Sequence, residues 1–226
     1  MHKLWKAAAL ACAVLGTPAW AFDLAGPNGG YYSLKVSTLK DAKSRGVIFQ
    51  QYDFSCGSAA LATLLTFHYR QPVSEQQVFR AMFERGDQQK IQQEGFSLLD
   101  MKRYLQSHGF QADGFEAPLE QLAAANLPAI VLITDNGYNH FVVIKGIRQG
   151  RVLIGDPALG LRAMPISDFK ALWRSGILFV IHSHQNVALA NIPNEWAAKP
   201  FAPIASGEWR DINPIPLLRR QPGDLF

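Results

Sequence analysis

The chain has 226 residues, of which 48% are apolar and 18% are charged, a balance that allows a buried core and excludes disorder throughout. Its 22 basic residues exceed the 18 acidic ones by only four, and no basic run or zinc-finger motif is present, so we expect no nucleic-acid partner. Two cysteines can form at most one disulfide, which excludes a small scaffold held together by several disulfides.

The first 21 residues have the pattern of a secretory signal peptide. Two lysines precede an uncharged apolar stretch, Ala7–Gly16, and small residues end the segment at Ala21. Cleavage after Ala21 would leave 205 residues with 20 basic and 18 acidic side chains, a net charge of +2. A lipoprotein signal with Cys12 lipidated is the alternative. Because the apolar stretch is too short for a final anchor, we expect a periplasmic or secreted protein without a membrane span.

The next segment of the chain is weakly patterned. We treat residues 22–46 as an N-terminal extension, loose over 22–30 and forming a weak edge strand near 31–39. An extended stretch at 47–51 opens the main domain, which we place at 47–184.

Three amphipathic helices are predicted next, because apolar residues recur at three- and four-residue spacing. The first spans 58–69, and the others run from Ser74 to Gly86 and from Ser97 to Gly109. Both serines are followed three residues later by a side chain that completes a capping box. Residues 87–94 are polar and rich in glutamine, so we expect a loop there.

The second half of the domain is rich in short strands. A continuous apolar run at 129–133 predicts a buried strand, and turn residues separate the later segments. Further strands are expected at 110–115, 140–147, 151–154, 161–164 and 177–181, with short helices at 118–125 and 167–173. Helices first and antiparallel strands second predict an α+β fold. Residues 185–226 hold six prolines, and we expect an extended tail that wraps the domain or stays mobile.

Cys56 is the one cysteine that survives the expected signal cleavage, so it cannot form an intramolecular disulfide. Most free cysteines are small buried hydrophobic residues. Cys56 however stands at the start of the first predicted helix, where unpaired N–H groups and the helix dipole stabilise an anion such as a thiolate. Gly57 would leave the backbone open to an approaching substrate. These features are typical of a cysteine nucleophile.

A thiolate nucleophile needs a general base, usually a histidine that a third polar group orients. His68 lies on the core side of the first helix and is expected to pack there, and His108 is explained by its place at a helix C-terminus. His182 and His184 have the spacing of a weak metal pair without further ligands, so no metal site is predicted. His140 instead begins an apolar strand directly after a turn, which favours a catalytic role.

Asp156 follows His140 by sixteen residues and ends the next strand. A tight turn at Gln149-Gly150 pairs the two strands antiparallel and places residue 140 almost opposite 158 or 159. Asp156 is then close enough to orient His140 and to stabilise an imidazolium. The alternative is that Asp156 and the proline after it serve only the turn.

Acyl transfer also needs hydrogen-bond donors for an oxyanion. The backbone N–H of Cys56 is one candidate. The side chain of Gln50, six residues upstream on the extended approach, is a second, and Gln51 is its competitor.

From about Val47 to His182 the chain resembles the papain-like cysteine peptidase domain that removes double-glycine leader peptides from bacteriocins. The segments that carry the resemblance are Gln50–Gly57, Gly95–Leu98, Asn139–Val143 and Gly155–Gly160. The resemblance implies a papain-like fold, with Cys56 as nucleophile, His140 as base and acid, Asp156 orienting His140, and Gln50 lining the oxyanion hole. It implies no cofactor and no metal.

Two departures from the family pattern stand out. An acidic residue usually precedes the nucleophile, but here the residue is Ser55, which affects the details of substrate contact. Most members are cytoplasmic domains of export transporters, whereas this sequence has a signal peptide and neither transporter spans nor an ATP-binding motif. In this architecture it resembles the free-standing FapD type, which accompanies functional-amyloid export systems.

These observations predict an exported cysteine endopeptidase that cleaves a secreted, outer-membrane or amyloid partner polypeptide after small residues of the Gly-Gly or Gly-Ala kind. Two other functions remain open. One is a peptidase fold that binds a glycine motif without cutting it, as an accessory module of a secretion system. The other is a transglutaminase-like acyl transferase that uses the same residues in the same order.

Overall fold

The computed structural model describes residues 22–25, 31–34, 44–135 and 137–197. The chain divides into two units, Met1–Thr38 and Leu39–Phe226. In the first unit β1 (Phe22–Ala25) pairs antiparallel with β2 (Tyr31–Leu34). Residues 22–25 are therefore a strand and not the loose segment that the sequence suggested, and the strand expected near 31–39 is seen over Tyr31–Leu34. The signal peptide, including Cys12, and the tail from 198 onward lie outside the described residues.

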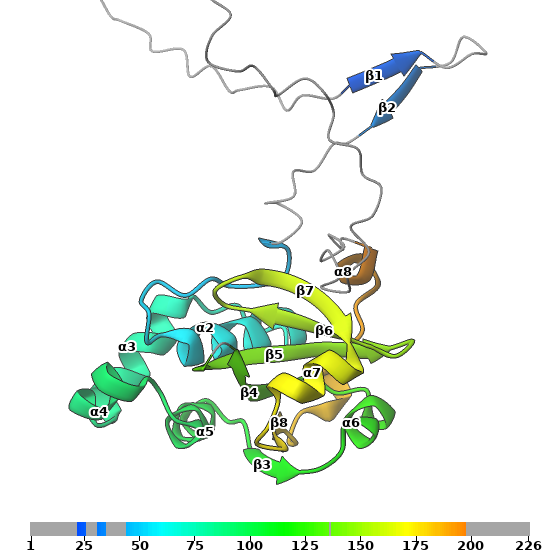
Figure 1. Ribbon diagram of the computed structural model, residues 1–226. Coiled ribbons are helices and arrows are strands. Elements are labelled where there is room, and N and C mark those ends of the chain that lie inside the picture. Colours follow the sequence, from blue (N-terminus) through cyan, green and yellow to red (C-terminus); the bar gives the residue numbers. More distant parts are fainter. Residues whose placement is uncertain (1–21, 26–30, 35–43, 136, 198–226) are drawn as a thin grey trace, which may run out of the picture. The chain divides into compact units, whose positions relative to one another are not determined.

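The helical half of the second unit begins at the cysteine. Helix α2 (Cys56–Thr63) continues as a π-helical segment, η1 (Leu64–His68), so the first predicted helix starts two residues earlier than expected and widens in its last turn. Helices α3 (Glu75–Arg85) and α5 (Leu98–Ser107) begin with the two predicted capping boxes. Both pack against α2 (Figure 1).

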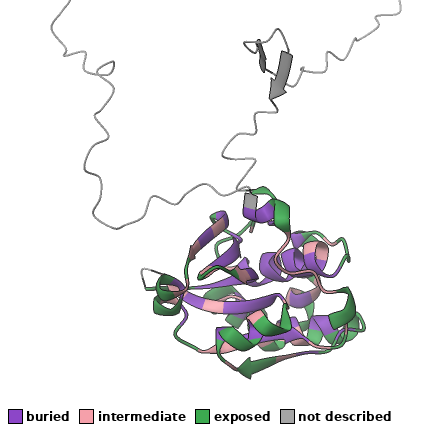
Figure 2. Cartoon of the chain, turned by 90° about the vertical axis from the view of Figure 1, so that its right-hand side faces the viewer, coloured by how far each residue is buried: buried purple, intermediate pink, exposed green. Residues whose placement is uncertain are grey.

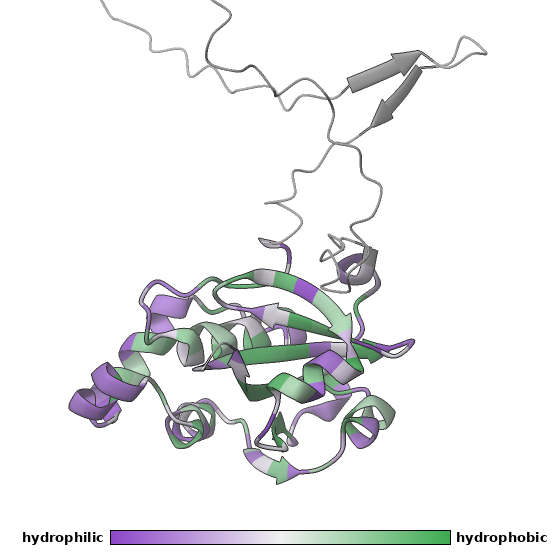
Figure 3. Ribbon diagram, viewed as in Figure 1, coloured by the Kyte–Doolittle hydropathy of each residue, from purple (hydrophilic) through white to green (hydrophobic). Residues whose placement is uncertain are grey.

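The expected loop at 87–94 is wrong, because Gln88–Glu94 forms helix α4. The Asp87 side chain accepts a hydrogen bond from the Lys90 backbone and caps the helix, while Ile91 is its one buried residue. The helix is hydrophilic over almost its whole surface (Figure 3). A single apolar residue gives no periodicity, so the capping aspartate and the helix-favouring Gln and Lys residues were the informative signal.

The described strands of the second unit form a six-stranded antiparallel sheet in the order β3-β8-β4-β5-β6-β7. Their bounds are β3 (Ala112–Glu116), β4 (Ala129–Asp135), β5 (Tyr138–Arg148), β6 (Arg151–Asp156), β7 (Gly160–Pro165) and β8 (Ile177–Ile181). Helices followed by an antiparallel sheet confirm the predicted α+β class. Among the described helices, none combines the length and the apolar composition that crossing a membrane requires.

Each face of the sheet has its own core. On one face Phe141 and Val143 of β5 pack among residues of α2, α3 and α5. On the other face Val142 and Ile144 pack with residues of α6 (Leu119–Ala125) and α7 (Ile166–Leu172). Burial follows this layering, with buried residues in the central strands and exposed ones on the outer helices (Figure 2). Strand β5 is thus covered on both faces, which makes it a rigid support.

The turn between β5 and β6 is the predicted one. Gln149 and Gly150 both have positive φ, 50° and 72°, as a two-residue hairpin turn requires. The register then shifts by one residue between Ile144 and Gly146, and Val143 pairs with Gly155. Beyond this shift, the end of β6 pairs with the start of β5 one residue out of the register that the turn sets.

The described part of the C-terminal segment packs on the domain. It contains a 3-10 turn, η2 (Gln185–Val187), and a short helix, α8 (Pro193–Ala197). Trp196 is buried in a small cluster with Val47 and residues of β6 and β7. Whether 184 is the domain limit stays a prediction, but residues beyond it contribute to the core.

Candidate active site

Cys56 is the first residue of α2 and is 7% exposed. Ser55, at the N-cap position, makes no side-chain cap bond to the helix, because its hydroxyl bonds the backbone N–H and C=O of Tyr52. The N–H groups of the first helical turn have no intrahelical partner, and Ser55 does not occupy them. They therefore remain available to a developing oxyanion beside the Cys56 thiol.

Gly57 allows close packing, and its expected role in substrate access stays a prediction. A Cβ atom at this position would lie 2.9 Å from Met101 Cε and 3.0 Å from Phe96 Cβ. The glycine therefore lets the N-terminal turn of α2 approach Phe96 and helix α5 closely. Any larger side chain would push the cysteine out of place.

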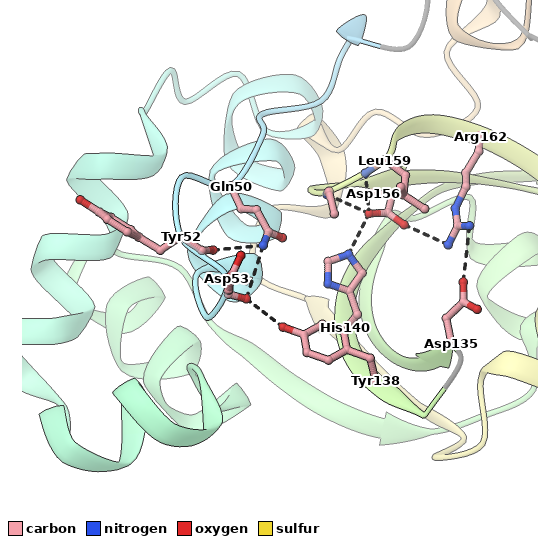
Figure 4. A network of polar contacts seen from close by, with 10 residues as sticks. Gln50, Tyr52, Asp53, Asp135, Tyr138, His140, Asp156, Leu159 and Arg162 are labelled. Carbon is pink, nitrogen blue, oxygen red and sulfur yellow. Dashed lines mark hydrogen bonds and ion pairs between the residues drawn. The ribbon is translucent and has the colours of Figure 1, made fainter.

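His140 and Asp156 meet as the hairpin geometry predicted. His140 Nε2 lies 2.8 Å from Asp156 Oδ1, and the two residues are 6% and 1% exposed. The same oxygen accepts the backbone N–H groups of Ala158 at 2.9 Å and Leu159 at 3.1 Å. Asp156 therefore both shapes the turn and orients the imidazole, so the two interpretations of this residue are not exclusive (Figure 4).

The imidazole links Asp156 to the cysteine. Burial alone lowers the pKa of His140, but the hydrogen bond and charge of Asp156, together with the influence of the Cys56 side chain, outweigh burial and raise the pKa to about 9. Nε2 is bound to Asp156, and Nδ1 is buried without a hydrogen-bond partner among the described residues, so Nδ1 is the nitrogen left to serve Cys56. The arrangement therefore favours an imidazolium at His140 at neutral pH.

Asp156 is held in its charged form. Burial raises its pKa, but the hydrogen bond and charge of His140, the charge of Arg162 and the Ala158 N–H together lower it. Arg162 Nη2 lies 2.9 Å from Asp156 Oδ2. The role of this arginine could not be recognised from the sequence, because a basic residue on a short strand has the same pattern as any partly exposed surface residue.

Gln50 lies beside the same site but is turned onto its own loop. Its Nε2 donates to the carbonyl oxygens of Tyr52, at 3.0 Å, and Asp53, at 3.4 Å. Its backbone N–H donates to Pro157 O at 3.1 Å, which joins the nucleophile loop to the turn after Asp156. The structure therefore places Gln50 at the site, with its amide bound to backbone carbonyls.

Tyr138 was also missed from the sequence. It stands two residues before His140 on β5, and its hydroxyl donates to Asp53 O at 2.8 Å. A hydrogen bond thus connects the strand that carries His140 to the loop before Cys56 (Figure 4).

The other histidines have local partners. His68 is fully buried beside Lys145, and His108 caps α5 and contacts the Tyr104 carbonyl at 2.8 Å. His182 Nε2 contacts Asp113 Oδ2 at 3.0 Å on the surface. Among the described residues, no group of three or more His, Cys, Asp or Glu side chains could hold a metal ion.

Comparisons with known proteins agree with this geometry. Residues 44–186 match the Peptidase C39 family. Two relatives named "Probable functional amyloid protease FapD" are 36% identical over 210 residues in Pseudomonas fluorescens, covering 88% of this chain and 92% of the relative, and 39% identical over 169 residues in Pseudomonas aeruginosa, covering 75% and 72%.

Among solved structures, a double glycine motif protease from an AMS/PCAT transporter, crystallised in complex with the leader peptide, has a TM-score of 0.51 to this chain. The identity is 28%, and the match covers 60% of this chain and 89% of that one. The similarity thus extends over most of a protease chain that was solved with a leader peptide bound.

Proposed function

The chain belongs to the peptidase C39 family, and we propose that it is an exported cysteine endopeptidase that cleaves a partner polypeptide after a Gly-Gly-like pair of small residues. Family membership establishes the enzyme class, a cysteine peptidase. The observation that supports the catalytic roles is the meeting of Cys56 at the start of α2, His140 on β5 and Asp156 on β6.

In the proposed reaction the Cys56 thiolate attacks the carbonyl carbon of the scissile peptide bond and forms a tetrahedral oxyanion. His140 then gives its Nδ1 proton to the leaving amine, the C–N bond breaks, and a thioester remains on Cys56. His140 next takes a proton from water, the hydroxide attacks the thioester, and the new carboxylate leaves as the thiolate returns. Asp156 holds the ring by Nε2 throughout.

The oxyanion is stabilised by the uncapped N–H groups at the start of α2. We assign the second donor to Gln50. Its contact with Asp53 O, at 3.4 Å, is the longer of its two bonds, so exchanging it for a charged oxygen gains more than it loses.

The relatives and the N-terminus support the substrate and the compartment. Two relatives are named as probable functional amyloid proteases, and this supports an amyloid or secretion-system protein as partner. The solved double glycine motif protease holds a leader peptide, which supports cleavage after small residues. The signal-like pattern of residues 1–21 supports action in the periplasm or outside the cell.

The test uses synthetic peptides that carry Gly-Gly or Gly-Ala within a flexible polar sequence, with mass spectrometry of the products. We expect cleavage after the small pair by the wild type, and loss of at least about a thousandfold in rate for Cys56→Ala, because the nucleophile is removed. Cys12 is lost with the expected signal peptide, so Cys56→Ala removes the one cysteine of the proposed mature enzyme.

Three other outcomes would overturn the proposal. Binding of the peptides without any new N-terminus identifies a non-cleaving module. An isopeptide product with an added amine identifies acyl transfer. Cleavage that persists in Cys56→Ala removes the cysteine mechanism.

A further inference from the structure

The two oxygens of the Asp156 carboxylate have different partners. Oδ1 accepts three N–H groups, from His140, Ala158 and Leu159. Oδ2 faces Arg162 Nη2 at 2.9 Å. Since the residue is 1% exposed, water is not available to take over either set of bonds. Both oxygens of the carboxylate are therefore held in place. The partner of Oδ1, His140, already has a proposed role in the reaction, whereas the partner of Oδ2, Arg162, does not.

Arg162 comes from β7, the strand beyond Asp156, where it pairs with Ile154 of β6. Its side chain is 23% exposed, and Nη1 lies 3.8 Å from Asp135 Oδ2 at the end of β4. Figure 4 shows the guanidinium between the two carboxylates, with Asp135 on the side away from Asp156. The guanidinium of Arg162 thus contacts Asp156 through Nη2 and Asp135 through Nη1.

A buried carboxylate without a cationic partner is strongly unfavourable. In the proposed reaction His140 is an imidazolium while the thiolate forms, but it is neutral after it has protonated the leaving amine. During that interval its charge no longer balances Asp156. Arg162 remains charged at every pH of interest, so it can keep Asp156 ionised through the whole cycle.

Arg162 also fixes the direction of the carboxylate. Rotation about the last side-chain bond of an aspartate is broad and nearly two-fold, so the carboxylate could turn its plane away from the imidazole. The contact between Nη2 and Oδ2 opposes this rotation and keeps Oδ1 aimed at His140 Nε2. An imidazole held in this way presents Nδ1 to Cys56 in a constant direction.

We propose that Arg162 is a positioning residue of the peptidase, which keeps the Asp156 carboxylate charged and aimed at His140 while His140 itself changes charge. The proposal rests on the proposed function, because it assigns a part in that reaction. Among the described residues, the charged and titratable groups around Asp156 are His140 of β5 and Arg162 of β7, with Asp135 of β4 behind Arg162 and Cys56 of α2 behind His140.

The experiment compares Arg162→Met, which keeps the length of the stem and removes the charge, with Arg162→Lys, which keeps the charge. With the Gly-Gly peptide as substrate, we expect Arg162→Met to lower kcat by about 10- to 100-fold with little change in KM, because the base is misoriented while the peptide still binds. Arg162→Lys should recover part of this loss, since a point charge replaces the planar fork.

A second readout does not need a substrate. The rate of Cys56 alkylation by iodoacetamide, measured against pH in the chain without residues 1–21, reports how the imidazolium of His140 activates the thiol. Without the Arg162 cation the Asp156 carboxylate takes up a proton more easily. The acid limb of the alkylation rate plotted against pH should therefore move up by about one pH unit in Arg162→Met. In Arg162→Lys it should stay near that of the wild type.

Arg151→Met is the matched control. Arg151 lies on β6, beside β7 in the same sheet, and its Nη2 donates to Ala163 O at 2.9 Å. This variant should keep kcat and the acid limb. If Arg162→Met does not fold, Asp135→Asn gives the same information in weaker form, with a smaller loss of kcat and an upward shift of the limb.

The outcomes separate the two proposals. If the wild type cleaves in a Cys56-dependent way and Arg162→Met matches it in kcat and in the acid limb, the role of Arg162 is refuted and the peptidase stands. If the wild type cuts no peptide but the alkylation limb still shifts as expected, the proposed function fails and the role of Arg162 in the ion pair stands. Equal losses in Arg162→Met and Arg151→Met would reduce Arg162 to a structural residue.

Discussion

His140 uses its two ring nitrogens for different tasks. Nε2 is bound to Asp156, so in the proposed reaction proton exchange with Cys56 and with the substrate passes through Nδ1. The direction of the ring is therefore set by a hydrogen bond on the side away from the cysteine. The buried Asp156 carboxylate can therefore influence the charge of the imidazole through one nitrogen, while the other nitrogen serves the substrate in the proposed reaction.

The raised pKa of His140 can be tested by removing its carboxylate partner. In Asp156→Asn the negative charge that helps to raise this pKa to about 9 is lost, while burial, which lowers the pKa, and the influence of Cys56, which raises it, both remain. We expect the His140 titration, followed by NMR of the imidazole carbon, to move down from about 9. The midpoint pH of the alkaline limb of the kcat/KM profile should fall by a similar amount.

The same shift has a stability consequence with a fixed sign. A histidine whose folded pKa exceeds its unfolded value of 6.5 contributes stability that is complete below pH 6.5 and is lost as pH rises through about 9. The difference in unfolding free energy between the wild type and Asp156→Asn should therefore shrink across that interval. A constant difference between about pH 6 and pH 10 would contradict the assignment.

Sequence reasoning found the residues of the site whose neighbours are set by short-range rules. A two-residue turn brings His140 to Asp156, and a helix start presents Cys56. Arg162 and Lys145 were not found, since their partners come from other strands and from the C-terminal segment. A basic residue on a short strand looks exposed until the register of the sheet is known.

At the scale of elements, the site lies where a helix end, a hairpin end and a loop converge. The hydrogen bond from Tyr138 to Asp53 O, at 2.8 Å, joins β5 to the loop before α2. The bond from the Gln50 backbone to Pro157 O, at 3.1 Å, joins that loop to the turn after β6. The loop is thus attached to both strands that carry the His140 and Asp156 side chains.

Tyr138→Phe tests the first of these attachments. The ring stays and one exposed hydrogen bond is lost, so we expect little change in melting temperature but a fall in kcat of about fivefold to tenfold, equivalent to about 1 kcal/mol. Kinetics with the Gly-Gly peptide and a thermal melt measure the two effects.

Tyr69→Phe is the matched control, because the Tyr69 hydroxyl also donates to a carbonyl, that of Ile181, at 3.2 Å. That bond is buried in the core, so its loss should lower the melting temperature and leave kcat intact. If both variants lose the same property, the hydroxyl of Tyr138 has no particular role at the site.

The errors at this scale have local causes. Periodicity located α2, α3 and α5 but not α4, whose one buried residue is Ile91. It also could not reveal the π-helical turn of η1, since the wider turn depends on what His68 contacts at its end. Element positions follow from patterns of burial, whereas such local geometry follows from tertiary partners.

At the scale of the whole domain, a buried cluster ties the C-terminal segment to the core. Lys145 of β5 is fully buried, and its Nζ contacts Gly46 O at 2.6 Å, His68 Nε2 at 3.0 Å and Glu195 Oε1 at 3.0 Å. The Leu189 N–H donates to His68 O, so the C-terminal segment also bonds the end of η1, the continuation of α2.

The protonation states in this cluster are mutually consistent. Burial, and then the charge of Lys145, lower the pKa of His68 to about 3. The neutral ring donates from Nδ1 to Leu189 O and accepts from Lys145 at Nε2. Burial lowers the pKa of Lys145 and raises that of Glu195, and their attraction offsets part of each change. Each ion therefore depends on the other for its charge.

This dependence gives a prediction about the extent of the folded domain. In Glu195→Ala the Lys145 ammonium loses its only anionic partner among the described contacts, which should destabilise the domain by about 3–5 kcal/mol. Lys145→Met should cost a similar amount, because Glu195 is then the unpaired ion. Lys145→Met combined with Glu195→Leu removes both charges and should lie much closer to the wild type than either single variant.

Urea unfolding of the four proteins completes the cycle. A strongly favourable coupling energy would mean that residues up to at least 195 belong to the cooperative unit, and that a chain ending at 184 folds poorly. Additive effects of the two substitutions would show that the segment docks without contributing to stability. Because Lys145 shares β5 with His140, a stable cluster also holds the strand that carries the base against the helix that carries Cys56.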